Sequence, residues 1–157
     1  MLAEVDPVTI RSARPGDVDR LIALLAHGAL VDGKEDPARP ESYATALAEI
    51  GSTPGNDILV AELAGVVVGM CQLLMFRHIQ GGGGLCAEIE SMHVHPDVRS
   101  RGIGGQLLSA AVEAARLAGC YRVQLTSNVQ RTDAHRFYAR HGFEPSHVGF
   151  KRVMGAD

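Results

Sequence analysis

The sequence has no tryptophan, few aromatic residues and no long apolar run, and each absence narrows what the chain can be. Aromatic residues make up 4% of the 157 residues, so aliphatic side chains must build the core. No stretch of about 18 apolar residues occurs, so we expect no membrane-spanning segment. The first seven residues carry Glu4 and Asp6 and lack the apolar centre of a secretion signal, which predicts a cytoplasmic protein.

An excess of one charge is also missing. Lys and Arg number 15, Asp and Glu number 18, and the formal net charge is -3. A general nucleic-acid-binding surface needs a basic excess, so we expect no nucleic-acid partner. The cysteines, at positions 71, 86 and 120, are odd in number and lack C-x-x-C spacing. They are best explained as small buried apolar residues, with a catalytic cysteine as the alternative.

The elements that the chain does contain fit one domain over residues 1–157, with residues 1–7 expected to be flexible. Hydrophobic periodicity predicts strands at 8–13, 58–63, 66–76, 85–94, 122–126 and 147–153. It predicts four helices, one between Pro15 and Gly28 and three more at 41–50, 102–118 and 132–140. Residues 31–40 are expected to form a loop, and Gly81–Gly84 a mobile one. The order predicts a mixed α+β fold, a sheet between helices.

The segment VHPDVRSRGIGGQLL, residues 94–108, carries the most chemical information. A strand ends there and an amphipathic helix begins, and the first N–H groups of a helix have no partner within it. The helix dipole adds partial positive charge, and Arg99 and Arg101 add full charge. Glycines allow a phosphate to approach the backbone, so the segment predicts a pyrophosphate site. It is not a P-loop, because G-x-x-x-x-G-K-[ST] is absent, and it lacks the third glycine of dinucleotide-binding turns.

This R-x-x-G-x-G turn between a strand and a long helix resembles the central motif of the GNAT acetyltransferases. Asn128 followed by AHRFYARHGF, residues 134–143, is similar to the second motif of that family. The resemblance extends over residues 9–153. It implies the acyl-CoA N-acyltransferase fold, with a mostly antiparallel mixed sheet of about six to seven strands flanked by four helices, and acetyl-CoA as co-substrate.

The same resemblance implies a role for each matching residue. Backbone groups of Met92 and Val94 would hold the pantetheine arm and the thioester carbonyl. The pyrophosphate would be held by Arg99 and by the N–H groups of Arg101, Gly102, Ile103, Gly104 and Gly105. Asn128 would bind the pantetheine arm, Phe137 and Tyr138 would face the cofactor, and Arg140 is a candidate for a CoA phosphate.

Acetyl transfer to an amine needs a base for the ammonium proton and an acid for the leaving thiol. Tyr138 suits the acid, because a phenol keeps its proton until about pH 10, although it could also be a packing tyrosine. Glu88 and Glu90 are expected to share one strand face with Met92, and neighbouring carboxylates raise one pKa. Either could be the base, directly or through water, or the pair could be salt-bridged or solvated. We expect direct attack of the amine, without an acyl-enzyme.

Two longer stretches resemble the aminoalkylphosphonate N-acetyltransferases: EIESMHVHPDVRSRG, from Glu88, and LTSNVQRTDAHRFYARHGFEPSH, residues 125–147. That subfamily acts on small anionic amines and is associated with a divalent metal. In this chain the candidate metal ligands form only pairs, His93 with His95 and Asp133 with His135. A metal site needs three or four converging ligands, so no metal ligands are assigned. His93 and His95 are expected on the strand face opposite Glu88 and Glu90.

The sequence therefore favours an enzyme that acetylates a small-molecule amine. The alternatives are a protein or peptide acetyltransferase, an acyl-CoA-binding sensor without catalytic activity, and a nucleotide-binding protein. Because GNAT members are often dimers, a homodimer is one candidate for the oligomeric state, which the sequence alone does not give. Arg39, Arg77 and His78 could bind an anionic acceptor or simply be solvated.

Overall fold

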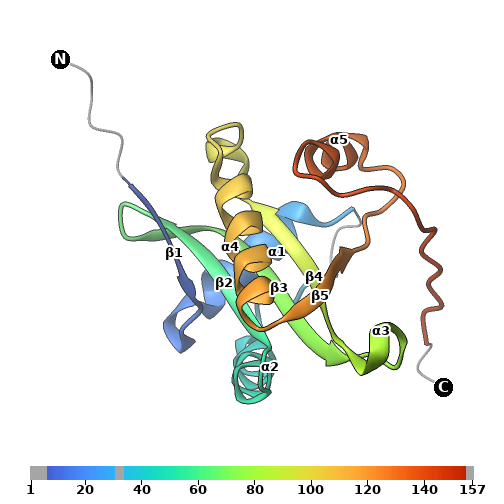
Figure 1. The fold of residues 1–157 in the computed structure, drawn as a ribbon. Helices are drawn as coiled ribbons and strands as arrows, with labels where there is room; N and C mark the ends of the chain where they lie inside the picture. Colours follow the sequence, from blue (N-terminus) through green and yellow to red (C-terminus); the bar gives the residue numbers. More distant parts are fainter. Residues whose placement is uncertain (1–6, 31–33, 155–157) are drawn as a thin grey trace.

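The computed structural model describes residues 7–30 and 34–154, so parts of the predicted flexible end and of the predicted 31–40 loop lie outside the described residues. The described chain forms five strands and five α-helices, so the expected count of six to seven strands and four helices is wrong (Figure 1). A short 3-10 turn precedes α1 and another precedes α4. In chain order the elements are β1 (Val8–Ser12), α1 (Val18–Gly28), α2 (Pro40–Ser52), β2 (Asp57–Leu63), β3 (Val66–Arg77), α3 (Gln80–Gly83), β4 (Leu85–Val94), α4 (Ile103–Leu117), β5 (Cys120–Leu125) and α5 (Thr132–Arg140).

One sheet runs through the protein in the order β1-β2-β3-β4-β5. The neighbouring strands are antiparallel except β4 and β5, which are parallel, so the predicted mixed and mostly antiparallel sheet is confirmed. The tight turn between β2 and β3 uses Ala64 and Gly65, whose φ angles of 50° and 77° are typical of hairpin turns. The parallel pair needs a long crossover, which α4 provides.

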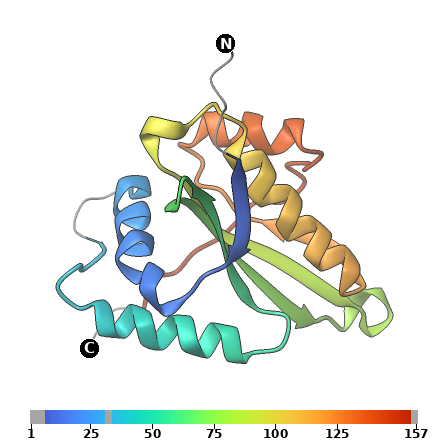
Figure 2. The ribbon, with the colours of Figure 1, turned by 90° about the vertical axis from the view of Figure 1, so that its left-hand side faces the viewer.

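Helices cover both faces of the sheet (Figure 2). On the face that we call the α1 face, Leu21 and Leu24 of α1 pack in one cluster with Val60 and Met70 of the sheet. On the opposite face, the α4 face, helix α4 buries a stripe in a second cluster with β2, β3 and β4. The stripe comprises Ile103, Leu107, Leu108, Ala111 and Ala115, at the spacing that the sequence predicted.

The strand predicted at 147–153 is wrong. Residues 143–154 form neither helix nor strand and run along the outside of the protein to the end of the described chain (Figure 1). Val148 is 77% exposed and Phe150 is 95% exposed. An apolar, β-prone sequence becomes a strand only where a neighbouring strand accepts its hydrogen bonds, and within the described residues this segment pairs with none.

The glycine run is also shaped differently from the expectation. Residues 80–83 form the short helical turn α3, with Gly81 and Gly82 at φ angles of 64° and 68°. A Cβ on Gly84 would lie 2.7 Å from Cδ1 of Tyr121, and one on Gly81 would lie 3.0 Å from the same ring. The glycines therefore let this loop close over the Tyr121 ring, a packing role that the sequence did not reveal.

Candidate active site

Strands β4 and β5 separate halfway along β4. Their pairing ends at Ile89 opposite Leu125, whereas β4 continues to pair with β3 as far as Val94 opposite Gly69. Residues 90–94 therefore have one edge with no β5 partner. Met92 and Val94, the residues expected to hold the pantetheine arm, lie on this open edge. The carbonyl of Val94 already accepts a 3.0 Å hydrogen bond from Nε of Arg99, which ties the arginine to the end of the strand.

A β-bulge in β4 changes which residues share a face. Gln72 pairs with Glu90 and Met70 pairs with His93, so two residues of β4, Ser91 and Met92, lie opposite one residue of β3. Ser91 has φ of 51°, so the backbone leaves the extended conformation at this bulge. Partners on antiparallel strands share a face, so Glu90 and His93 lie on the same side.

The expected arrangement of these side chains is therefore wrong. Met92 packs in the core cluster of the α4 face, away from Glu90. His93 lies against Gly28 of α1, and the ring of His95 is 4.9 Å from that of His27. The sequence prediction assumed a regular strand, and one inserted residue reverses the alternation.

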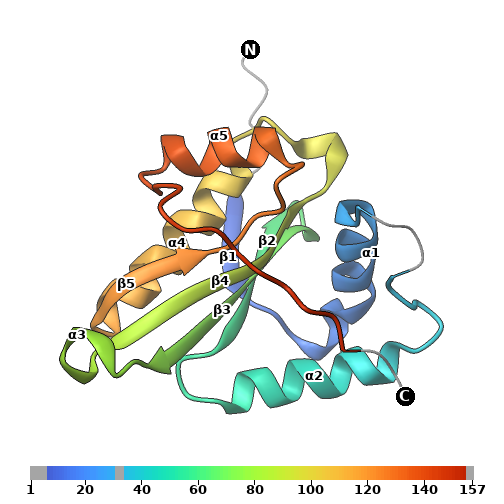
Figure 3. The same ribbon diagram turned by 90° about the vertical axis from the view of Figure 1, so that its right-hand side faces the viewer.

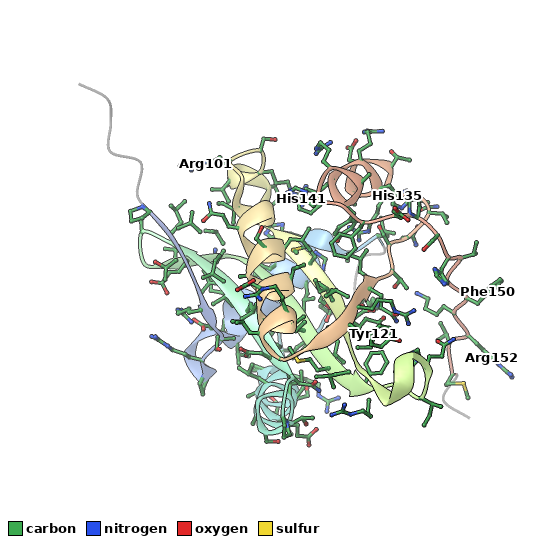
Figure 4. The ribbon with its side chains drawn as sticks, viewed as in Figure 1. Arg101, Tyr121, His135, His141, Phe150 and Arg152 are labelled. Atoms are coloured by element: carbon green, nitrogen blue, oxygen red, sulfur yellow. The ribbon has the colours of Figure 1, made fainter. Side chains whose placement is uncertain are left out.

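The predicted anion site is the start of α4. Gly102 precedes the helix with φ of 78°, and its carbonyl accepts the first bond of the helix, from the N–H of Gln106 at 3.1 Å. The N–H groups of Ile103, Gly104 and Gly105 lie in the first turn, where no carbonyl of the same helix is available. Arg101 is exposed just before this turn (Figure 4).

Two of the glycines face α5 rather than open space. A Cβ on Gly104 would lie 3.4 Å from the Phe137 ring and 3.7 Å from Val94. A Cβ on Gly105 would lie 3.0 Å from Nε2 of His141, whose side chain lies between α4 and α5 (Figure 4). These glycines bring α5, and Phe137 with it, close to the open edge of β4. His141 was not identified from the sequence, although it follows directly after the motif helix.

The remaining cofactor candidates lie on or before α5. Asn128 is exposed, and its side-chain oxygen accepts a 2.9 Å bond from the N–H of Gln130, which shapes the turn before the helix. Its carbonyl is hydrogen-bonded to Nε2 of His135, also at 2.9 Å. Arg140 is exposed at the end of α5.

Glu88 and Glu90 lie on the α1 face but in different environments. Oε2 of Glu88 accepts a 2.9 Å hydrogen bond from Nε2 of Gln124 on β5. Burial raises the pKa of Glu90, and the neighbouring negative charge and hydrogen bonding of Glu88 raise it further. The pair is thus asymmetric: a bonded carboxylate lies beside a carboxyl group that retains its proton to higher pH.

Tyr138 is half-buried on α5, with its ring 5.2 Å from Phe137 and 6.1 Å from Phe143. Burial raises the pKa of Tyr138, the charge of Arg131 lowers it, and Glu90 adds to the increase. The charges of Glu90 and Arg131 thus act on the phenol of Tyr138, although no direct contact joins Tyr138 to Glu90 or Glu88.

His93 and Arg131 are two residues of the site that the sequence prediction did not assign. A Cβ on Gly28 would overlap the ring of His93, so the histidine packs directly on the end of α1. Burial lowers the pKa of His93 to about 4, helped by the charges of Arg131 and Arg99 and opposed by Glu35. A guanidinium nitrogen of Arg131 donates to the carbonyl of Gly28. Three segments therefore meet at one point: the end of α1, the bulge of β4 and the loop before α5.

Cys71 and Cys120 do not offer an activated nucleophile. Burial raises the pKa of the Cys71 thiol to about 12, and burial also raises the pKa of Cys120. Across residues 7–30 and 34–154, no group of three or more His, Cys, Asp or Glu side chains could hold a metal ion. The helices of the same residues include none that is long and apolar enough to cross a membrane.

Comparison with known proteins agrees with this geometry. The pattern of the Acetyltransferase (GNAT) family matches residues 26–143. An aminoalkylphosphonate N-acetyltransferase from Salmonella typhimurium is 35% identical over 152 residues, which cover 96% of this chain and 95% of that protein. The chain belongs to the GNAT family of acetyltransferases.

Solved structures show the same fold. A protein described as a transcriptional regulator from Bacillus halodurans C-125 superimposes with a TM-score of 0.90 at 37% identity, covering 94% of this chain and 100% of its own. A putative acetyltransferase from Agrobacterium tumefaciens str. C58 gives a TM-score of 0.83 at 27% identity, over 93% of this chain and 99% of its own.

Family membership identifies the chain as an acetyl-CoA-dependent N-acetyltransferase, rather than a nucleotide-binding protein or a sensor without activity. The hydrogen-bonding and charged groups of the site fit acetyl-CoA. Unbonded N–H groups at the start of α4 and the charges of Arg99 and Arg101 suit a pyrophosphate. The open edge of residues 90–94 offers peptide groups of the kind that a pantetheine amide can pair with, as an added strand would.

Proposed function

We propose that this enzyme transfers the acetyl group of acetyl-CoA to the primary amine of a small molecule, by direct attack of the amine on the thioester. The observation that carries the proposal is the meeting of three features at the bulge of β4. These are an open strand edge, a helix start suited to an anion, and the pair Tyr138 and Glu90 with raised pKa values.

The geometry supports the binding roles that the family resemblance implies. The first-turn N–H groups of Ile103, Gly104 and Gly105 bind the pyrophosphate, and Arg99 and Arg101 neutralise its charge. Met92 and Val94 present the backbone of the open edge to the pantetheine arm, and Asn128 binds the arm from the other side. Phe137 covers the arm where it passes Gly104. Arg140, exposed on the same helix, binds a CoA phosphate.

Acetyl-CoA, when bound, supplies an acetyl thioester. Glu90, directly or through a water molecule, takes the proton of the attacking ammonium, because its raised pKa makes it a better base than an ordinary carboxylate. Glu88, fixed by Gln124, keeps that pKa raised. As the C–N bond forms and the C–S bond breaks, Tyr138 gives its phenolic proton to the departing sulfur, and the resulting phenolate takes the second proton of the acetylated nitrogen. Its raised pKa ensures that it holds that proton at neutral pH.

A small acceptor is favoured over a peptide because the relative that covers 96% of the chain is an aminoalkylphosphonate N-acetyltransferase. Arg131 is consistent with an anionic acceptor, since its charge acts on both His93 and Tyr138. We therefore place aminoalkylphosphonates first among the acceptors to be tested. A protein or peptide substrate is the second candidate.

The test is to incubate the purified enzyme with acetyl-CoA and matched acceptors and to measure acetylated product by mass. The set contains an aminoalkylphosphonate, the carboxylate and sulfonate of the same chain length, the uncharged alkylamine, and short peptides with free N-termini or lysine. Parallel reactions with and without a divalent metal test whether the activity depends on the metal associated with the aminoalkylphosphonate subfamily. Acetylation of the anionic amines above the neutral amine supports the proposal, and acetylation of peptides alone would replace it.

A further inference from the structure

Arg131 lies where the end of α1 meets the start of α5, and the proton transfers proposed above do not use it. Its guanidinium donates a hydrogen bond to the carbonyl of Gly28, the last residue of α1. Its backbone N–H donates to the carbonyl of Asn128 at 2.9 Å, and its carbonyl accepts from the N–H of His135 at 3.0 Å. In Figure 3 the chain enters α5 at the end of that helix nearer to α1. Arg131 therefore ties the turn before α5 and the first turn of α5 to the end of α1.

The carbonyl of Gly28 is a favourable partner for a positive charge. The last carbonyl groups of a helix have no N–H partner within it, and the helix dipole adds partial negative charge there. Gly28 is buried, so its carbonyl would lose free energy without a donor. The absence of a Cβ at Gly28 also leaves room for the ring of His93. The guanidinium of Arg131 is thus held at a defined place, beside the bulge of β4.

The charge of Arg131 acts on the phenol of Tyr138. The two residues are seven positions apart, close to the spacing that returns to the same face of a helix after two turns. Burial raises the pKa of Tyr138, Arg131 lowers it, and Cys71 and Glu90 raise it. Among the described groups that act on this phenol, Arg131 is the one that favours the phenolate. His93, with a pKa of about 4, adds no positive charge at neutral pH.

We propose that Arg131 is a positioning residue for the proton donor: fixed on the last carbonyl of α1, its guanidinium stabilises the phenolate that Tyr138 becomes when it protonates the departing sulfur. The inference rests on the proposed function, because it requires Tyr138 to be the acid. The O–H bond of Tyr138 breaks, the proton goes to the sulfur, and the electron pair stays on the phenolic oxygen. A half-buried phenolate is costly, and Arg131 offsets that cost until the phenolate takes the second proton of the acetylated nitrogen.

The test is a double-mutant cycle on kcat for thiol release, with Arg131→Gln, Tyr138→Phe and the two together. The acceptor is the amine of the series above that is acetylated fastest, at a saturating concentration. Arg131→Lys keeps the charge but loses the planar set of donors. Arg136→Gln is the matched control, since it removes an exposed arginine of the same helix that is paired with Asp133. CoA binding and thermal unfolding of each variant identify any loss of the fold.

We expect kcat to fall about 10-fold in Arg131→Gln, by less in Arg131→Lys, and not in Arg136→Gln. In the Tyr138→Phe background, Arg131→Gln should change kcat by less than about twofold, because no phenolate forms there. Equal losses in both backgrounds would overturn the proposal. A higher KM for the acceptor with an unchanged kcat would also overturn it, because Arg131 would then only bind the acceptor.

A second measurement does not depend on activity. The chain has no tryptophan and three tyrosines, so the ultraviolet absorbance of tyrosinate can be followed in an alkaline titration of the free enzyme. Subtracting the titration of Tyr138→Phe isolates Tyr138. We expect the pKa of Tyr138 to be higher in Arg131→Gln than in the natural enzyme and in Arg136→Gln. An unchanged titration would overturn the proposal.

The two proposals fail in different ways. If Tyr138→Phe keeps the natural rate, the proposed function loses its acid and the role of Arg131 is lost with it. If Tyr138→Phe is impaired but Arg131→Gln lowers kcat equally with and without the phenol, the role of Arg131 alone is contradicted.

Discussion

The buried histidine of the β4 bulge makes the stability of this enzyme sensitive to mild acid. His93 has a pKa of about 4 in the folded protein, against 6.5 for an unperturbed histidine. The unfolded chain therefore binds the proton more readily, and folding loses free energy as pH falls from above 6.5 toward 4. The full difference corresponds to about 3 kcal/mol, and roughly 2 kcal/mol of it is lost between pH 7.5 and pH 5.

A matched substitution separates this effect from the titration of carboxylates. In His93→Gln no group at position 93 titrates, while Arg99, Arg131 and Glu35 still surround it. We expect the stability of the variant to fall by about 2 kcal/mol less than that of the natural protein between pH 7.5 and pH 5. Urea unfolding at the two pH values measures the difference. Equal losses in both proteins would show that His93 is not protonated on unfolding, and the reasoning from burial would be wrong.

Three further predictions follow from packing and charge. Arg11→Met leaves Asp17 and Glu62 without the guanidinium that lies 2.7 Å from each. We expect urea unfolding to show that the free energy of unfolding falls by about 3 kcal/mol. An unchanged free energy would mean that these ion pairs do not stabilise the fold. Gly105→Val places a side chain against His141 and should lower the free energy of unfolding, measured by thermal unfolding, by roughly 1–3 kcal/mol. Adding His141→Ala should restore part of that stability. A double variant that is no more stable than Gly105→Val would contradict the contact. Gln124→Leu removes the hydrogen-bond donor that fixes the Glu88 side chain beside Glu90, so the influence of Glu88 on Glu90 weakens and the acid limb of kcat/KM against pH should move to lower pH. An unmoved limb would exclude Glu90 as the base.

Much of the fold was predictable because its signals are local. The apolar stripe of α4 and the hairpin at Ala64 and Gly65 follow from periodicity and turn chemistry, and the structure confirms both. The conformation of residues 147–153 could not be predicted in this way. The apolar residues of this segment indicate a strand, but a strand also needs a partner, and periodicity does not say whether one exists in the same chain.

The candidate site was predictable in its parts more than in its arrangement. The R-x-x-G-x-G turn identified the start of α4, yet Gly104 and Gly105 face α5, which depends on contacts far apart in sequence. The bulge at Ser91 reversed the expected faces of Met92 and His93. A bulge adds one residue without a clear composition signal, so simple alternation cannot reveal it.

The most direct test of the proposed mechanism is the rate of free thiol release from acetyl-CoA in the presence of an accepted amine, for the natural enzyme, Tyr138→Phe and Tyr121→Phe. Tyr121 is a second phenol, 45% exposed on β5, and serves as the matched control. The account predicts release that requires the amine, a loss of about 100-fold or more in Tyr138→Phe, and an unchanged rate in Tyr121→Phe. Equal rates in Tyr138→Phe and the natural enzyme would contradict the role of Tyr138, and failure of the natural enzyme to bind CoA would contradict the site itself.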